Sequence, residues 1–146
     1  MHDAASPEKQ ERYEKALAGL EVFIISGRLD FDRAVADFDQ TIKLDPKVAL
    51  AYHNRGNALA RKRDYDRAIA DYSEAIRLDP KYARAYSRLA TLYVVLPSYT
   101  NTDVREAEDQ ALKYADAASA LDPTLAEPFA VKGLLDSRSA GHLVEQ

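Results

Sequence analysis

The chain of 146 residues contains no cysteine, and histidine and glycine are scarce. Without cysteine there is no disulfide framework, no thiolate zinc site and no cysteine nucleophile, a pattern that fits a reducing cytoplasm. His2, His53 and His142 stand far apart, and none has the spacing of a metal-binding pair. We therefore expect a cytoplasmic protein with no metal site and no other cofactor.

Long apolar runs are also missing. The longest, residues 16–27 (ALAGLEVFIISG), is interrupted by Glu21 and follows an acidic segment, so we interpret it as neither a signal peptide nor a membrane span. The formal net charge of -4 at pH 7 and the pI near 5.4 give no general attraction to phosphate backbones or anionic lipids. We expect neither nucleic acid nor a membrane as a partner.

Catalytic motifs are absent as well. The sequence has no glycine-rich phosphate loop, no GxSxG and no recognisable set of nucleophile, base and orienting group. Acidic pairs such as Asp64 and Asp66 are expected to be solvated charges near a helix start, where negative charge is favourable. We predict no catalytic residue and no enzymatic activity. An alternative is that this segment regulates a larger protein, which itself could be catalytic.

The sequence does contain an internal repeat. Residues 30–46 (DFDRAVADFDQTIKLDP) and 64–80 (DYDRAIADYSEAIRLDP) are identical at 10 of 17 positions and lie 34 residues apart. A third LDP, at residues 121–123, follows the second after one further period and a nine-residue insertion. A period of this length is typical of a stacked repeat fold.

Apolar spacing predicts two helices in each period. In the second period, Tyr52, Gly56 and Leu59 form one stripe, and a second stripe surrounds Ala68 and Tyr72. The small residues allow paired helices to approach closely beside the aromatic rings. We also expect the Asp-Pro dipeptides at 45, 79 and 122 to end one helix and start the next, because aspartate can cap a helix and proline is tolerated in its first turn.

These residues resemble the tetratricopeptide repeat (TPR) family, and the YxNRG in the second unit is typical of its bacterial-type repeats. The family pattern is matched in the second unit by Tyr52, Gly56, Ala68, Tyr72 and Pro80, and in the third by Tyr86, Leu89, Tyr93, Ala111 and Pro123. In the third unit, Ala90 replaces the glycine and Ala115 the aromatic residue. The resemblance implies an all-α fold, a right-handed α-solenoid of about three helix-turn-helix repeats with a C-terminal capping helix.

The same pattern predicts the boundaries. We expect a disordered N-terminus at 1–6, a single TPR domain at 7–139 and a flexible tail at 140–146. Within the domain, the repeats are placed at about 13–48, 49–82 and 83–125, with an insertion at 96–104 and the cap helix at 126–139. The first helix, residues 7–27, has an uncertain register. The insertion is either a surface loop or a lip that uses Tyr99 as a contact.

Stacked repeats bind partners on a concave wall, which in this family is lined by the first helix of each unit. The helical spacing i, i+4, i+7, i+11 brings polar residues to one face in two successive units. The predicted peptide-binding groove consists of Leu50, His53, Asn54, Asn57, Arg61, Arg84, Ser87, Arg88, Thr91 and Val95. The expected partner is another protein or an extended peptide, with an acidic or C-terminal carboxylate held by the two arginines of the third unit.

In co-chaperones of the family, an asparagine in one unit and a lysine and arginine in the next clamp the C-terminal carboxylate of heat-shock chaperones. Asn54, Arg84 and Arg88 occupy those positions, whereas Gly19 and Phe23 stand where the first unit should supply a lysine and an asparagine. The resemblance thus implies an incomplete clamp. Alternatively, Asn54 only marks the bacterial-type subfamily, in which YxNRG occurs without a known clamp.

The predicted role is therefore a non-catalytic adaptor or scaffold, either monomeric or weakly homo-oligomeric. Self-association is the structural alternative, because a short array has exposed ends. Apolar residues that could stack against another copy are Phe23, Ile24, Ile25, Phe129 and Leu134.

Overall fold

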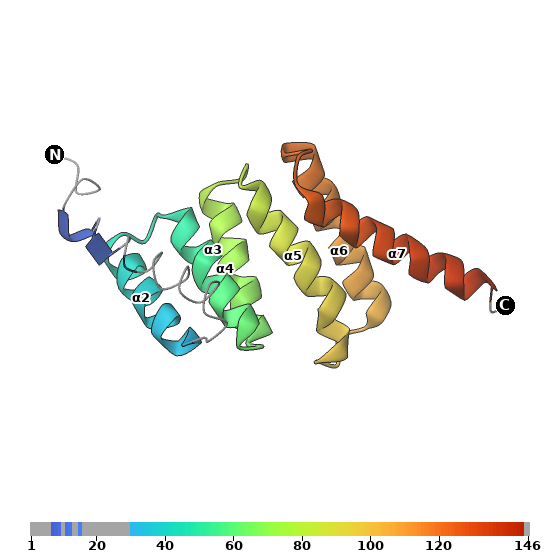
Figure 1. Ribbon diagram of the computed structural model, residues 1–146, viewed down its shortest axis with the longest axis horizontal. Coiled ribbons are helices and arrows are strands. Elements are labelled where there is room, and N and C mark those ends of the chain that lie inside the picture. The colour runs from blue at the N-terminus through green and yellow to red at the C-terminus, as the bar shows by residue number, and fades with distance from the viewer. Residues whose placement is uncertain (1–6, 10, 13–14, 16–29, 145–146) are drawn as a thin grey trace. The chain divides into compact units, whose positions relative to one another are not determined.

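The computed structural model describes residues 7–9, 11–12, 15 and 30–144, and the regular structure in this part of the chain is helical throughout (Figure 1). The chain divides into two compact units, Met1–Pro80 and Lys81–Gln146. From here on, the first and the second unit are these two parts of the chain rather than single repeats. Most of the predicted first helix, including Gly19, Phe23 and the two isoleucines after it, lies outside the described residues.

The first unit contains α2 (Phe31–Leu44), α3 (Ala49–Arg61) and α4 (Tyr65–Leu78), with α3 packed against both of its neighbours. Each helix turns one apolar stripe inward, as the spacing predicts. The buried residues on these stripes include Ala34, Phe38, Leu59, Ala68, Tyr72 and Ala75. The prediction of two helices per period is confirmed for the residues that the structure describes.

The tightest point in this unit lies between α3 and α4. A Cβ placed on Gly56 would lie 2.9 Å from Cε1 of Tyr72, whose ring is only 2% exposed. The ring cannot move aside easily, because its hydroxyl donates a 2.6 Å hydrogen bond to Oδ1 of Asn57. Glycine at position 56 is therefore required by the aromatic residue opposite it.

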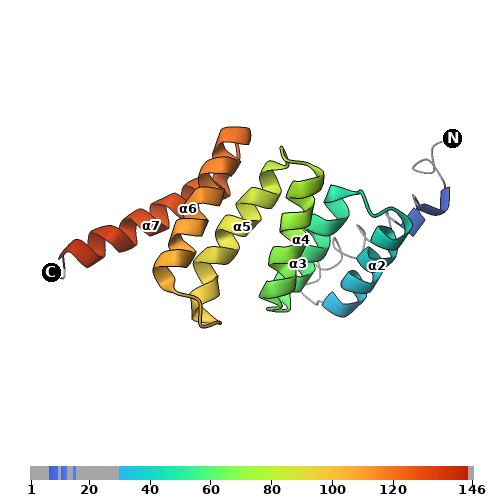
Figure 2. The ribbon, with the colours of Figure 1, turned by 180° about the vertical axis from the view of Figure 1, so that it is seen from behind.

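The second unit contains α5 (Ala83–Val95), the 3-10 helix η2 (Leu96–Ser98), α6 (Val104–Leu121) and α7 (Ala126–Val144). α5 and α6 pair along their length, and α7 packs against both (Figure 2). Here the glycine and the aromatic residue of the first unit are replaced by alanines, and α7 fills the space between them. Its side chains contribute to a core cluster of Ala90, Ala111, Ala115, Val131 and Leu135.

In the second unit, tyrosines complete the core at positions that differ from those in the first unit. The rings of Tyr93 and Tyr114 stack with their centroids 5.8 Å apart, and Tyr86 meets Tyr114 at 6.3 Å. Burial, together with the neighbouring Tyr114 and Glu106, raises the pKa of Tyr93. Tyr93 and Tyr114 thus pack against the buried cluster that α7 shares with α5 and α6.

The expectation that Asp-Pro starts each following helix is wrong. Asp45 and Asp122 are C-cap residues, and the next helices begin at Ala49 and Ala126. The aspartate side chains close local turns instead: Oδ1 of Asp45 accepts from the backbone N–H of Lys47, and Oδ1 of Asp122 accepts from that of Thr124. This bond to a residue two positions ahead competes with helix capping, and proline between them favours the turn.

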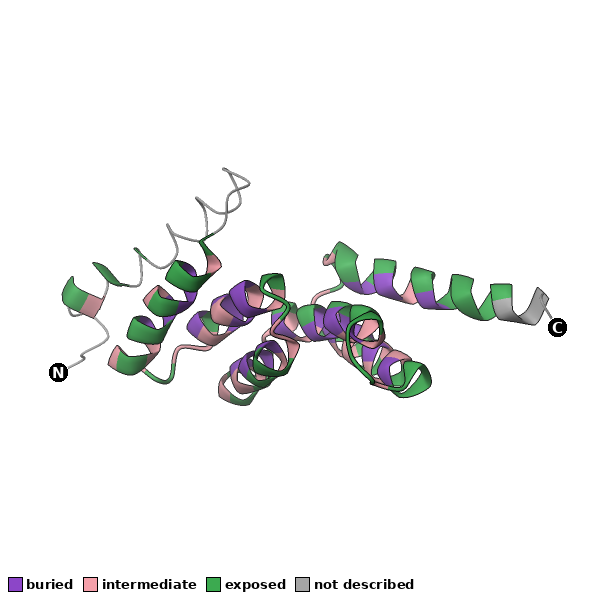
Figure 3. Cartoon of the chain, turned by 90° about the horizontal axis from the view of Figure 1, so that it is seen from below, coloured by how far each residue is buried: buried purple, intermediate pink, exposed green. Residues whose placement is uncertain are grey.

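The cap helix is longer than predicted. It continues past residue 139 to Val144, through the segment expected to be a flexible tail, because no proline interrupts residues 136–144 and the helix tolerates Gly141. Pro128, Val131 and Leu135 are buried, whereas residues 136–141 are exposed on every side (Figure 3). Only the first half of α7 therefore contributes to the core of the unit.

The insertion has a defined conformation. α5 ends at Val95, η2 continues to Ser98, and Asp103 caps α6 by accepting from the backbone N–H of Glu106 at 3.0 Å. Leu96 is buried, and its carbonyl accepts a 2.8 Å hydrogen bond from the hydroxyl of Thr100. Tyr99 is 52% exposed, so a contact role for it stays a prediction.

Replacing Gly56 with alanine tests the close approach. Alanine normally stabilises a helix relative to glycine by about 1 kcal/mol, but overpacking against a fixed ring costs roughly 1–3 kcal/mol. We expect Gly56→Ala to lower the free energy of unfolding by up to about 2 kcal/mol, measured by urea unfolding followed by circular dichroism.

Gly133→Ala on α7 is the matched control, because a Cβ there meets nothing within 4 Å. This variant should gain up to about 1 kcal/mol of stability. If both variants raised the unfolding midpoint, Gly56 would not be constrained by Tyr72.

Candidate functional site

The predicted groove residues of the third repeat, which lies in the second compact unit, form an exposed stripe on α5. Arg84, Arg88, Thr91 and Val95 are all exposed, at the helical positions i, i+4, i+7 and i+11. Thr91 directs its hydroxyl to the carbonyl of Ser87, 3.2 Å away on the preceding turn. The stripe thus begins with two guanidinium groups one turn apart and ends at one apolar side chain, Val95.

Ser87, predicted on the same face, is 3% exposed and lies beneath a carboxylate from α7. Its hydroxyl donates a 3.1 Å hydrogen bond to Oε2 of Glu127, while Oε1 of that side chain is 3.6 Å from Nη1 of Arg88. Sequence reasoning missed Glu127, since the contact joins residues 40 positions apart. Its only signal was an acidic residue in the first turn of the cap helix.

Arg84 also has an acidic neighbour. Hydrogen bonds from the side chain and backbone of Thr124 lower the pKa of Asp122, and attraction to Arg84 lowers it further. Both cations of the α5 stripe therefore lie near carboxylates of the corner between α6 and α7.

The predicted residues of the first unit do not form one exposed stripe. Leu50 and Arg61 are at the surface of α3, but His53 and Asn54 are each only 5% exposed. Asn57 is half-buried and accepts the hydrogen bond from Tyr72, so it supports the core. Helical spacing places the α5 residues on a face that is exposed. It could not predict that the middle of α3 is buried.

A second feature missed by sequence reasoning is the ion pair of Arg55, a residue that departs from the leucine of the family pattern. Its Nε and Nη2 donate to the two carboxylate oxygens of Asp71, each at 2.7 Å, and its Nη1 contacts Asp39 at 2.9 Å. The hydrogen bonds and charge of Asp71, and then those of Asp39, raise the pKa of Arg55 above its ordinary value. This arginine joins α3 to both α4 and α2.

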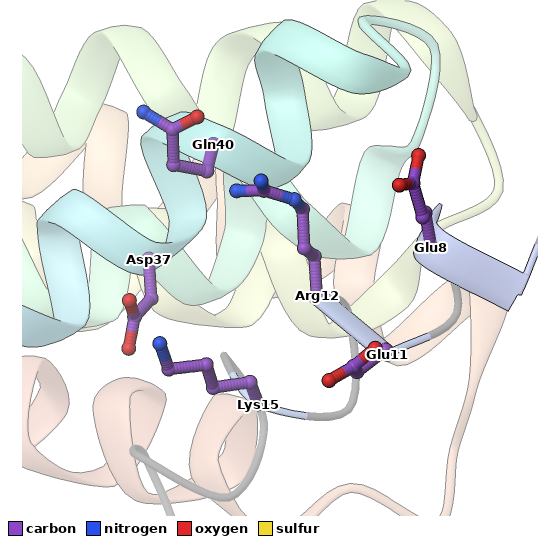
Figure 4. Close-up of a pocket in the computed structure, with 6 residues that line it drawn as sticks. All are labelled: Glu8, Glu11, Arg12, Lys15, Asp37 and Gln40. Atoms are coloured by element: carbon purple, nitrogen blue, oxygen red, sulfur yellow. The ribbon is translucent and has the colours of Figure 1, made fainter.

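A hollow of about 340 Å³ lies beside α2 (Figure 4). Its described lining consists of Glu8, Glu11, Arg12, Lys15, Asp37 and Gln40. Small-molecule sites are lined mainly by apolar and aromatic side chains, which this described lining lacks. The hollow therefore does not indicate a site for an apolar ligand.

The exposed apolar residues of α7 are separated. Phe129 and Leu134 are 53% and 44% exposed, but their spacing puts them about 140° apart around the helix. Lys132 lies over the Phe129 ring at 5.6 Å. These two side chains do not form one apolar stripe for self-association.

None of the helices in the described part of the chain is both long enough and apolar enough to cross a membrane. Nor do three histidine, aspartate or glutamate side chains converge as metal ligands within the described ranges.

Comparison with known proteins identifies the family. A sequence profile described as "Tetratricopeptide repeat" matches residues 27–83 and 53–101. The TPR2B domain of yeast Sti1, solved as a complex with pHsp70, is 31% identical, with 90% of this chain and 98% of that chain covered and a TM-score of 0.69. No curated protein matches the chain.

Two more distant structures share the fold. The Arabidopsis OM64 TPR domain is 22% identical, with 89% of this chain and 95% of that chain covered and a TM-score of 0.74. The first TPR of Spaghetti (RPAP3), solved bound to the HSP90 peptide SRMEEVD, is 20% identical, with 90% and 95% covered and a TM-score of 0.71. The chain belongs to the tetratricopeptide repeat family, and its all-helical repeat fold is the fold of that family.

The buried ion pair gives a testable prediction. Arg55→Leu leaves the Asp71 carboxylate, 8% exposed, without its partner. We expect the free energy of unfolding to fall by about 2–3 kcal/mol, below the cost of a fully buried pair because the Arg55 side chain keeps some exposure. Arg55→Leu/Asp71→Asn should recover part of this loss, since no buried charge remains.

Arg77→Ala is the control, because it removes an exposed pair with Glu74 on the surface of α4. Surface pairs contribute little, so the unfolding midpoint should hardly change. A loss as large as that of Arg55→Leu would show that ion pairing in general, rather than burial of Asp71, determines the effect.

Proposed function

We propose that the protein is a non-catalytic interaction module that uses the exposed face of α5 to bind an extended peptide carrying a carboxylate. The observation that carries the proposal is the pair of guanidinium groups, Arg84 and Arg88, on one face of a helix in an acidic protein. Residues four apart on a helix have Cβ atoms about 6 Å apart, so the two groups can hold one carboxylate or two neighbouring ones. Guanidinium–carboxylate hydrogen bonds are charge-assisted and directional.

The rest of the face suits an extended chain. From Arg84 to Val95 the helix rises about 16 Å, which matches about five residues of extended peptide. Thr91 offers a hydroxyl in the middle of this length and Val95 an apolar contact at its end. A peptide with an acidic residue at one end and an apolar side chain near the other would complement the stripe.

The family supports this use of the face. The yeast TPR2B domain, 31% identical to this chain, is solved as a complex with pHsp70. In the family the first helix of each unit provides the binding wall, and α5 is the first helix of its unit. The α3 half of the predicted groove stays a prediction, with Leu50 and Arg61 as the residues at its surface.

The proposal predicts peptide binding that depends on the two arginines. An array of synthetic peptides with acidic C-termini, including SRMEEVD, would be screened, and the best binder measured by fluorescence anisotropy. Loss of two charge-assisted hydrogen bonds should weaken binding of that peptide to Arg84→Ala/Arg88→Ala by at least about tenfold. The amidated form of the peptide should also bind more weakly if its terminal carboxylate is the group recognised.

Arg105→Ala/Lys113→Ala is the matched control, because both residues are exposed on α6 in the same unit and the net charge changes equally. Its affinity should stay within about twofold of the parent chain. Equal weakening in both double variants would show that overall charge, rather than the two arginines, determines binding. If no peptide in the array bound, the proposed function would be refuted.

A further inference from the structure

The corner between α6 and α7 already places a carboxylate on the α5 stripe. Glu127 accepts from the buried hydroxyl of Ser87 through one oxygen and approaches Arg88 through the other, at 3.1 Å and 3.6 Å. One oxygen of this side chain therefore already lies near the guanidinium that a ligand carboxylate would contact. Asp122, the second carboxylate at this corner, is fixed by two hydrogen bonds from Thr124.

The contact of Glu127 with Arg88 is suited to displacement. Both side chains are about half exposed, at 44% for Arg88 and 47% for Glu127, and such pairs contribute only about 0–1 kcal/mol. The buried Ser87 hydroxyl keeps the glutamate positioned, because a buried donor requires an acceptor. The glutamate is thus held in place without being bound tightly.

We propose that Glu127 is an internal competitor that restricts the α5 stripe to carboxylate peptides able to displace it. The inference rests on the proposed function, because competition requires a ligand carboxylate at Arg88. A ligand that offers only one carboxylate exchanges one weak ion pair for another and gains little. A ligand that also contacts Thr91 and Val95 gains enough to displace the glutamate, so Glu127 sets a threshold of affinity.

The competition predicts that removing the charge of Glu127 tightens binding. Glu127→Gln keeps the side-chain size and an oxygen for Ser87 but loses the attraction to Arg88. The affinity for an array-selected acidic peptide, measured by anisotropy, should rise by about threefold to fivefold. The factor should be the same for a peptide shortened to its last two residues, because an internal competitor weakens every ligand that displaces it equally.

Glu108→Gln is the matched control. Glu108 pairs with Arg138 at 3.5 Å between α6 and α7, with side-chain exposures of 29% and 48%, so the same charge is removed from a comparable ion pair away from the stripe. Its affinity for the peptide should equal that of the parent chain. An equal rise in both variants would refute competition and leave a nonspecific effect of net charge.

A second measurement reports the contact without any ligand. In a ¹³C NMR spectrum, the side-chain carboxyl signal of Glu127 should shift in Arg88→Ala, whereas that of Glu108 should not. No shift at Glu127 would overturn the inference. Peptide binding that is unchanged by Glu127→Gln would overturn the inference alone, whereas no binding to either chain would overturn the proposed function and the inference with it.

Discussion

Close contact between the two helices of a repeat is the constraint on which the rest of the structure depends. In the first unit the helices meet through glycine against a buried tyrosine ring, with the tyrosine hydroxyl bound to Asn57. In the second unit they meet through Ala90, Ala111 and Ala115, and the vacant volume is occupied by α7. The size of one residue therefore determines whether a helix pair fills its own interior or accepts a side chain from the next helix.

Charged residues serve two separate purposes around these cores. Arg55 donates hydrogen bonds to both Asp71 and Asp39, and so it joins three helices. Arg88 forms a looser, half-exposed contact with Glu127 and can exchange it. Burial and distance, rather than the type of residue, distinguish an arginine that stabilises the fold from one that can recognise a partner.

The helices and their stripes could be predicted because aromatic and small residues recur at a fixed period, and the outward direction of α5 followed from the helical repeat. The start of each following helix could not, because the Asp-Pro aspartates form local turns that compete with capping. The burial of Asn54 and the contact of Glu127 with Ser87 depend on which helices lie next to one another. A periodic pattern predicts which face of a single helix is apolar. It does not predict which other helices pack against that helix.

The alanine at position 115 is part of the surface on which α7 packs. Val131 and Leu135 of α7 share a buried cluster with Ala90, Ala111 and Ala115, whereas in the first unit the buried ring of Tyr72 lies beside Gly56. A larger side chain at position 115 would therefore be expected to crowd α7. Changes at residue 115 are thus coupled to the side chains of α7, since a larger residue there would need smaller ones at positions 131 or 135.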